Sequence, residues 1–125
     1  MNIRIAVISL WAEDVDAAAI FYRDGIGLPL QSHFAGSHPH FDLGGTILTI
    51  QCGHPIQRPE AELRFPVIAF TVPCLDAAVE KLRSHGVDLP WGVEANASGR
   101  WVMFHDPAGN LIELVEFTFK TEHGL

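Results

Sequence analysis

Glu113 is the residue with the clearest chemical potential, because it stands among apolar side chains near the end of the chain. Residues 111–117 read LIELVEF, and the period-two geometry of a strand places Glu113 on one face with three apolar residues. A charged carboxylate in such surroundings is costly unless it is paired, hydrogen-bonded, protonated or bound to a metal. Glu113 is therefore a candidate metal ligand, general base or ligand-binding group. The plainer alternative is a carboxylate that meets water or the guanidinium of Arg100.

Two histidines offer a second route to metal chemistry. His38 and His40 are two residues apart, so on a strand both imidazoles would lie on one face, where they could bind zinc or iron together with the carboxylate of Glu113. Pro39 lies between them, and residues 35–39 have the composition of a loop. The alternatives are a direct contact with a ligand and an exposed loop without function.

Further side chains could contact a ligand without taking part in acid–base chemistry. The tryptophans could line an aromatic cleft for a flat or cationic ligand, and ordinary core packing is the alternative for each. Residues 91–99 are rich in small and polar residues and could form a lid over that cleft. Arg100 could pair with Glu113 or with an anionic ligand, or lie on the surface. The remaining candidates are neutral hydrogen-bonding groups and the tryptophans: Ser9, Thr49, Gln51, Thr71, Trp11, Trp91 and Trp101.

The composition is that of one domain that recognises a small molecule or another protein. The chain has 125 residues, of which 48% are hydrophobic and 18% charged, and a formal net charge of −7. No run of Lys or Arg is present, which argues against nucleic acid and anionic membranes as partners. No segment approaches the roughly 20 apolar residues that span a bilayer, and the N-terminus has no signal-peptide pattern, which predicts a cytoplasmic location.

A short internal repeat divides the chain into two similar halves. Residues 15–19 (VDAAA) recur as residues 75–79 (LDAAV), and Arg23 recurs as Arg83 in the same register. The same order of expected elements surrounds both copies, so the sequence predicts two modules of the type βαβββ. The expected boundaries are residues 1–53 for the first module, 54–64 for a linker and 65–119 for the second module.

Apolar periodicity and turn residues predict the elements within each module. Asp14 is the expected N-cap of a first helix that runs to about Asp24, where Gly25 and Gly27 are the stop signals. The second helix is expected at residues 75–85, and both helices have one apolar stripe that would cover a sheet. The expected strands span residues 3–10, 28–34, 41–43 and 46–52 in the first module, and 66–72, 87–89, 100–105 and 110–119 in the second.

A tight turn precedes the strand that carries Glu113. Residues 106–110 read DPAGN. Pro107 presets φ, Asp106 can accept hydrogen bonds from the backbone ahead, and Gly109 and Asn110 tolerate positive φ. A strand is therefore expected to begin directly after the turn.

These residues resemble the vicinal oxygen chelate superfamily, which includes glyoxalase I, fosfomycin and bleomycin resistance proteins, and extradiol dioxygenases. The resemblance covers nearly the whole chain. It implies an α+β fold in which two βαβββ modules form an incomplete barrel around a cleft, often completed as a homodimer. The segments that carry it are residues 14–19, 21–24, 27–28, 41–45, 67–72 and 106–114.

The same resemblance implies that the usual metal site is missing. Metal-using members take ligands from the first strand of each module and from the last strand, where Glu113 matches the carboxylate position. The first-strand positions are occupied by Val67 and by Val7, or by Ile5 if the register slips by two. A further family ligand from the fourth strand corresponds to Thr49, which is a poor metal ligand. No cofactor is therefore expected, and a divalent metal at His38, His40 and Glu113 is the alternative.

Two classes of function follow from these observations. The first is a metal-free protein that binds a small polar or cationic molecule, similar to the resistance proteins that sequester their drug. The second is an enzyme, a lyase, isomerase or dioxygenase, that uses Glu113 as a general base or an atypical His/Glu metal site. A sensing or accessory domain that regulates a partner chain is a third possibility.

Overall fold

The computed structural model describes residues 5–33, 38–54 and 67–118. These residues form two compact units. The first contains the described residues up to His54 together with Asp106–Asn110, and the second contains the rest. The expected linker at residues 54–64 lies outside the described residues except for His54, and so do residues 35–37 of the expected loop at 35–39.

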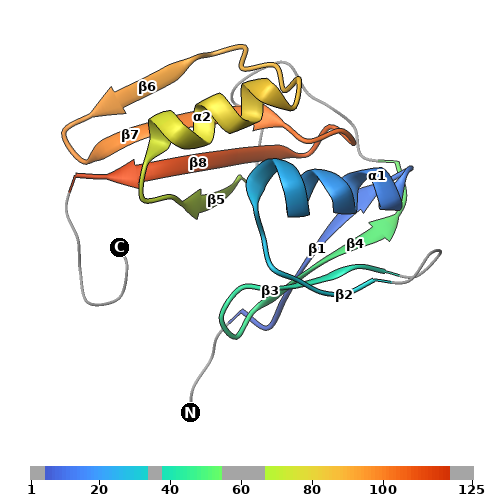
Figure 1. Ribbon diagram of the computed structural model, residues 1–125. Coiled ribbons are helices and arrows are strands. Elements are labelled where there is room, and N and C mark those ends of the chain that lie inside the picture. The colour runs from blue at the N-terminus through green and yellow to red at the C-terminus, as the bar shows by residue number, and fades with distance from the viewer. Residues whose placement is uncertain (1–4, 34–37, 55–66, 119–125) are drawn as a thin grey trace. The chain divides into compact units, whose positions relative to one another are not determined.

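The first unit is a helix packed on a mixed four-stranded sheet (Figure 1). The sheet has the order β1-β4-β3-β2, with β1 parallel to β4 and the other neighbours antiparallel. Its elements are β1 (Val7–Ala12), α1 (Val15–Ile20), the π-helix η1 (Phe21–Ile26), β2 (Leu30–Ser32), β3 (His40–Asp42) and β4 (Ile47–Cys52).

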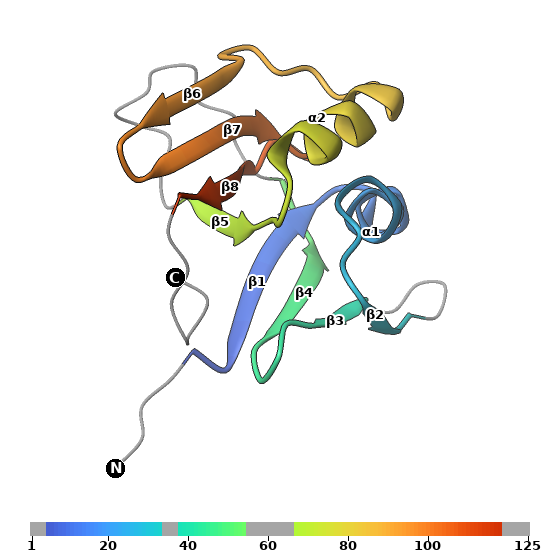
Figure 2. The same ribbon diagram turned by 60° about the vertical axis from the view of Figure 1, so that its left-hand side comes forward.

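The second unit repeats this plan, as the second view shows for its sheet and for α2 (Figure 2). Its sheet has the order β5-β8-β7-β6, with β5 parallel to β8 and the other neighbours antiparallel. Its elements are β5 (Ile68–Thr71), α2 (Leu75–Ser84), β6 (Val93–Asn96), β7 (Gly99–His105) and β8 (Leu111–Phe117). The internal repeat, the two βαβββ modules and the α+β class are thereby confirmed.

Each helix covers one face of its own sheet, as its apolar stripe predicts. In the first unit Ala18, Ala19 and Tyr22 are buried with Leu48 and Ile50 of β4. The carboxylate of Asp14 accepts a hydrogen bond from the Ala17 backbone N–H at 2.9 Å, which confirms it as the N-cap. One face of each sheet is thus committed to the core, and functional side chains must come from the opposite face.

The N-terminus of α2 is capped by a side chain from strand β8 rather than by its own N-cap residue. Leu75, Val79 and Leu82 are its buried stripe, but its N-cap residue Cys74 makes no side-chain capping bond. Glu116 of β8 takes that role, because its Oε1 accepts the Leu75 backbone N–H at 2.9 Å. This N–H, followed by the guanidinium of Arg100, lowers the pKa of Glu116.

Three local expectations are wrong. Gly25 does not stop the first helix, which continues as η1 to Ile26 and ends at Gly27, where φ is +94°. Residues 87–89 form no strand, and β6 lies instead at Val93–Asn96, paired with β7. The expected lid at residues 91–99 is therefore largely a strand of the sheet. No helix in the described residues has the length and apolar character needed to cross a membrane.

Replacing Gly99 with alanine is expected to lower the free energy of unfolding by about 1–3 kcal/mol, because overpacking against backbone cannot relax cheaply. A Cβ there would overlap the Glu116 carbonyl oxygen and lie 3.0 Å from the Phe117 Cα. Urea denaturation measures the change. The matched control is Gly25→Ala, where the new Cβ would meet the Phe21 ring at an ordinary 3.5 Å. Equal effects of the two substitutions would contradict the prediction.

Candidate ligand-binding faces

The first unit gathers five of the predicted site residues on the sheet face opposite α1. Strand alternation turns Ser9 and Trp11 away from the buried Leu10, and the parallel register pairs Ser9 with Thr49 and Trp11 with Gln51. His40 of β3 pairs with Thr49 from the other side. We call this surface, formed by Ser9, Trp11, His40, Thr49 and Gln51, the first open face.

The five residues of the first open face supply hydrogen-bonding groups and one aromatic ring, and the apolar pair Val7 and Ile47 continues the same side of the sheet. The row Ser9–Thr49–His40 crosses three neighbouring strands, and the Gln51 side-chain amide donates to Ser9 Oγ at 3.4 Å. Trp11 is 48% exposed. Its ring is seated against Gly53, where a Cβ would approach the indole Cε3 to 2.5 Å. Glycine at that position therefore lets the indole lie over the end of β4.

Glu113 lies on the corresponding face of the second sheet. Its register neighbours are Ala69 of β5 and Met103 of β7. Alternation places Trp101 and Thr71 on the same face, one step along their strands. Glu94 of β6 pairs with Trp101. We call the surface formed by Glu113, Glu94, Trp101, Met103 and Thr71 the second open face.

The surroundings of Glu113 disfavour its charged form. Glu113 is half-buried, and burial, followed by the like charge of Glu94, raises its pKa above the ordinary 4.5. Glu94 was missed by sequence reasoning because residues 91–99 had the composition of a loop. Its place opposite Trp101 follows from the pairing of β6 with β7, for which the short, exposed segment Val93–Asn96 gives little signal in the sequence.

Arg100 does not join Glu113, and Trp91 contacts the last residue of β7. Arg100 lies on the helix-facing side of the second sheet, where its guanidinium bonds Asp76 at 3.1 Å and Glu116 at 3.3 Å. Of the alternatives for Arg100, the pairing with Glu113 is wrong, because alternation puts the two side chains on opposite faces. Trp91 precedes β6, and its ring centroid lies 5.6 Å from that of His105.

The strand neighbours of Glu113 supply no further ligand for a divalent metal. The strand neighbours of Glu113 offer a methyl group and a thioether, and the two first-strand family positions are Val7 and Val67. Across residues 5–33, 38–54 and 67–118, no three His, Cys, Asp or Glu side chains come together as a group that could hold a metal ion. His38 and His40 belong to the first unit and Glu113 to the second. The family ligand positions at Val7, Thr49 and Val67 do not fit the metal that the family uses, because these side chains are poor metal ligands.

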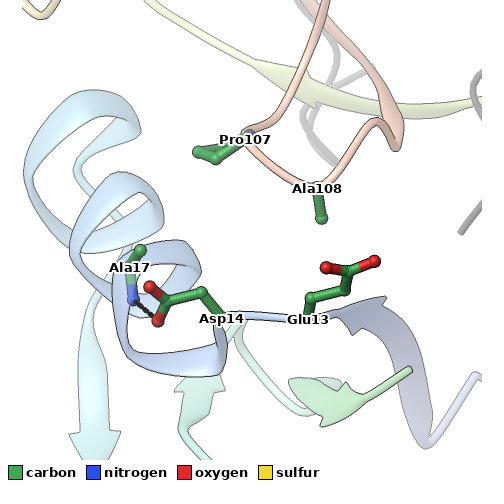
Figure 3. Close-up of a pocket in the computed structure, with 5 residues that line it drawn as sticks. All are labelled: Glu13, Asp14, Ala17, Pro107 and Ala108. Atoms are coloured by element: carbon green, nitrogen blue, oxygen red, sulfur yellow. Dashed lines mark hydrogen bonds between the residues drawn. The ribbon is translucent and has the colours of Figure 1, made fainter. Parts of the chain in front are cut away.

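A hollow of about 360 Å³ lies in the first unit (Figure 3). Its carboxylates already have partners. Asp14 caps the helix through the Ala17 N–H, and Glu13 accepts from the His54 imidazole at 2.7 Å. The hollow therefore contains none of the predicted site residues. Its lining is Glu13, Asp14, Ala17, Pro107 and Ala108.

The turn that precedes Glu113 is a structural anchor of the first unit. Asp106 is 4% exposed, and its carboxylate accepts four hydrogen bonds. The donors are the Tyr22 hydroxyl at 2.6 Å, the backbone N–H groups of Ala108 and Asn110 at 3.0 and 2.8 Å, and the Asn110 side chain at 2.9 Å. Burial, followed by the charge of Asp106, raises the pKa of Tyr22 well above its ordinary value. The Asn110 side-chain amide also donates to the Trp11 carbonyl at 3.0 Å, which ties the turn to the end of β1.

Comparison with known proteins identifies the class. A family model described as the Glyoxalase/Bleomycin resistance protein/Dioxygenase superfamily matches residues 4–114. The chain belongs to this superfamily. A search of curated proteins gives no match.

Solved structures with the same fold differ in what their names describe. The chain is 27% identical to TnmS3, an antibiotic binding protein from Streptomyces sp. CB03234, over 94% of this chain and 99% of that one, with a TM-score of 0.72. A glyoxalase/dioxygenase from Nostoc punctiforme is 24% identical over 93% and 92% of the chains, with a TM-score of 0.76. A lactoylglutathione lyase from Agrobacterium tumefaciens is 23% identical over 93% and 95%, with a TM-score of 0.71. The last two likenesses concern the fold alone.

Proposed function

We propose that the protein binds a small organic cation on its second open face, without a metal and without chemical conversion. The observation that carries the proposal is the electrostatic state of Glu113. Burial and Glu94 both disfavour its ionised form, so a cation placed beside it would relieve the repulsion and compensate the desolvation. Without a bound cation, the ionised form of this half-buried carboxylate destabilises the fold.

The neighbours of Glu113 suit a cation that is organic rather than metallic. Trp101 lies beside Met103 on the same face and directly opposite Glu94. An indole face attracts ammonium and guanidinium groups through its quadrupole, and Met103 adds apolar, polarisable contact area. The net charge of −7 adds a long-range attraction for cations. The antibiotic-binding neighbour at 27% identity supports a binding role for this fold.

Binding of benzyltrimethylammonium tests the proposal, with benzyl alcohol as the uncharged comparison. Titration calorimetry should show wild-type protein preferring the cation, and Glu113→Gln should weaken the cation roughly tenfold, the size expected for loss of one charged partner. Glu113→Gln should leave the weak binding of benzyl alcohol unchanged. Equal affinity of wild type and Glu113→Gln for the cation would remove the basis of the proposal.

An enzyme that uses Glu113 as a general base is the second candidate. The same raised pKa favours it, because a base poised closer to neutrality can both accept and return a proton. Solvent exchange separates the two functions. If wild-type protein in D₂O catalyses deuterium incorporation next to the carbonyl of 2-oxobutanoate, and Glu113→Gln does not, the enzymatic function replaces the binding function.

Assembly and location complete the proposal. We extend the proposal to a homodimer, which the family resemblance supports and in which each chain supplies its own second open face, and to a cytoplasmic location. Light scattering at micromolar concentration gives the mass in solution, and a value of one chain would contradict the dimer.

A further inference from the structure

The apolar pattern of β8 suits either of its two glutamates on the second open face. Residues 111–116 read LIELVE, so the odd positions hold two apolar residues and Glu113, and the even positions hold two apolar residues and Glu116. The apolar residues of both sets are buried. A one-residue slip against β7 would turn Glu113 to the helix-facing side of the sheet and Glu116 to the open face. The in-and-out pattern of β8 therefore does not decide which glutamate lies on the open face.

The turn between β7 and β8 decides it, because the length of a hairpin loop fixes how its strands pair. The Asp106 backbone N–H donates to the Asn110 carbonyl at 2.9 Å and closes the turn. Inside it, Asp106 Oδ1 accepts the backbone N–H groups of Ala108 and Asn110 at 3.0 and 2.8 Å. One carboxylate thus specifies the loop of residues 106–110, and this loop length pairs Met103 with Glu113.

Tyr22 of η1 holds this turn from the first unit. Its hydroxyl donates to Asp106 Oδ2 at 2.6 Å, and its backbone carbonyl accepts the N–H groups of Gly27 and Leu28 at 3.1 and 2.9 Å. Tyr22 is fully buried, so it is fixed through both its main chain and its side chain. The turn is grouped with the first unit, whereas the two strands that it joins belong to the second. A side chain of the first unit therefore restrains the turn from which the strand of Glu113 begins.

We propose that Asp106 and Tyr22 are positioning residues for Glu113, because they hold the turn that sets the register of β8 and keeps Glu113 on the second open face. In the same register, Glu116 lies on the other side and caps α2 through the Leu75 N–H at 2.9 Å. One register thus gives each glutamate its own role. Only the contact of Glu113 with a cation rests on the proposed function, because the register is a property of the unliganded protein.

Nuclear Overhauser contacts between β7 and β8 report the register of the unliganded protein directly. Wild type should show one set of contacts, with Met103 opposite Glu113. Asp106→Ala removes the acceptor of the turn and should add a second set, with Met103 opposite Ile112 or Leu114. Asp106→Asn keeps an acceptor oxygen for the backbone N–H groups of the turn and should keep the single set. The wild-type set alone in folded Asp106→Ala would overturn the proposal.

Cation binding by Tyr22→Phe gives a second readout, and it decides the proposal if Asp106→Ala does not fold. At a temperature where each variant is fully folded by circular dichroism, the affinity of Tyr22→Phe for benzyltrimethylammonium should fall roughly three- to tenfold, the range for one hydrogen bond. The matched control is Thr46→Val, which deletes a first-unit hydroxyl that donates to the Ile5 carbonyl at 2.6 Å and should leave the affinity unchanged.

The outcomes of the binding experiment separate the two proposals. Equal affinities of wild type and Tyr22→Phe, or equal losses in Tyr22→Phe and Thr46→Val, would overturn the positioning role of Tyr22. If Glu113→Gln does not weaken the cation in the wild-type background, the proposed function has failed. The Overhauser contacts then still decide whether the turn sets the register.

Discussion

Replacing Asp106 with alanine is expected to lower the free energy of unfolding by about 3–5 kcal/mol, the range for breaking a buried charged network by removing one partner. The substitution leaves the Tyr22 hydroxyl and the donors of the turn without their acceptor. Tyr22 is fully buried, so its hydroxyl cannot turn to water. Urea denaturation followed by circular dichroism measures the loss, which would be a large part of the stability of a domain this size.

A double-mutant cycle isolates the long-range bond within this network. Tyr22→Phe keeps the ring that packs against Phe21 and Phe41 and removes only the hydroxyl, and its expected effect is about 1–3 kcal/mol. Because both substitutions delete the same 2.6 Å bond, the double variant should be more stable than the sum of the single effects predicts. Asp106→Asn keeps the shape and one acceptor oxygen and should fall between wild type and Asp106→Ala. Additive effects of Tyr22→Phe and Asp106→Ala would show that the hydrogen bond contributes nothing.

The hydrogen bonds of Asp106 give the turn at residues 106–110 a structural role rather than a catalytic one. Residues 106–110 predict a turn by composition alone, because proline, glycine and asparagine each favour one of its conformations. The partner Tyr22 could not be predicted, since it is 84 positions away and its place on an apolar helical stripe predicts only burial. Local propensity thus predicts where the chain turns. The hydrogen bond from Tyr22 that holds the turn is a tertiary contact, and the tertiary structure is needed to find it.

The same division applies to the elements. Both sheets were predictable because apolar alternation and turn residues recur in each half of the chain, and α2 because its stripe is regular. The π-helix at Phe21–Ile26 was not predictable from the sequence. Over six residues, the apolar periodicity of a π-helix differs too little from the 3.6-residue period of an α-helix to be recognised. Strand β6 was missed because Val93–Asn96 is exposed throughout and carries little apolar signal.

Strand alternation was a better guide than charge or hydrogen-bonding type to which site residues share a face of the sheet. Ser9, Thr49 and Gln51 lie on one face because each alternates with buried apolar residues, which the sequence already displays. Charge made Glu113 one of the possible partners of Arg100, and the register instead pairs Arg100 with Glu116.

Lowering the pH is expected to abolish the preference of the second open face for a cation. Protonation removes the charge of Glu113, and because its pKa is raised, this happens at a higher pH than for an ordinary glutamate. The affinity for benzyltrimethylammonium should fall roughly tenfold between pH 7.5 and the acid side of the transition, the loss expected from Glu113→Gln at neutral pH. The Glu113→Gln variant should itself show little pH dependence in the same titration.

The folding stability of the unliganded protein should change with pH in the opposite direction to cation binding, because ionised Glu113 favours binding but disfavours the fold. Because the folded pKa lies above the unfolded one, the folded state binds more protons in the interval between them, and stability falls as the pH rises through it. Above the folded pKa the full penalty of the ionised carboxylate is present, and below the unfolded pKa it is absent. Glu113→Gln should therefore have a higher Tm than wild type at pH 7.5 and the same Tm near pH 4. A lower Tm at pH 7.5 would mean that ionised Glu113 stabilises the unliganded fold.

Glu94 provides the control that assigns this behaviour to a carboxylate pair. Glu94→Gln removes the like charge but not the burial, so the pKa of Glu113 should move partway back toward its ordinary value. The midpoint of the pH profile for benzyltrimethylammonium should then shift to lower pH, even though the loss of one negative charge also weakens binding. Weaker binding with an unchanged midpoint would show that Glu94 contacts the cation without acting on Glu113. A lower midpoint would show that the two carboxylates oppose each other in the free protein, which is the condition that a bound cation relieves.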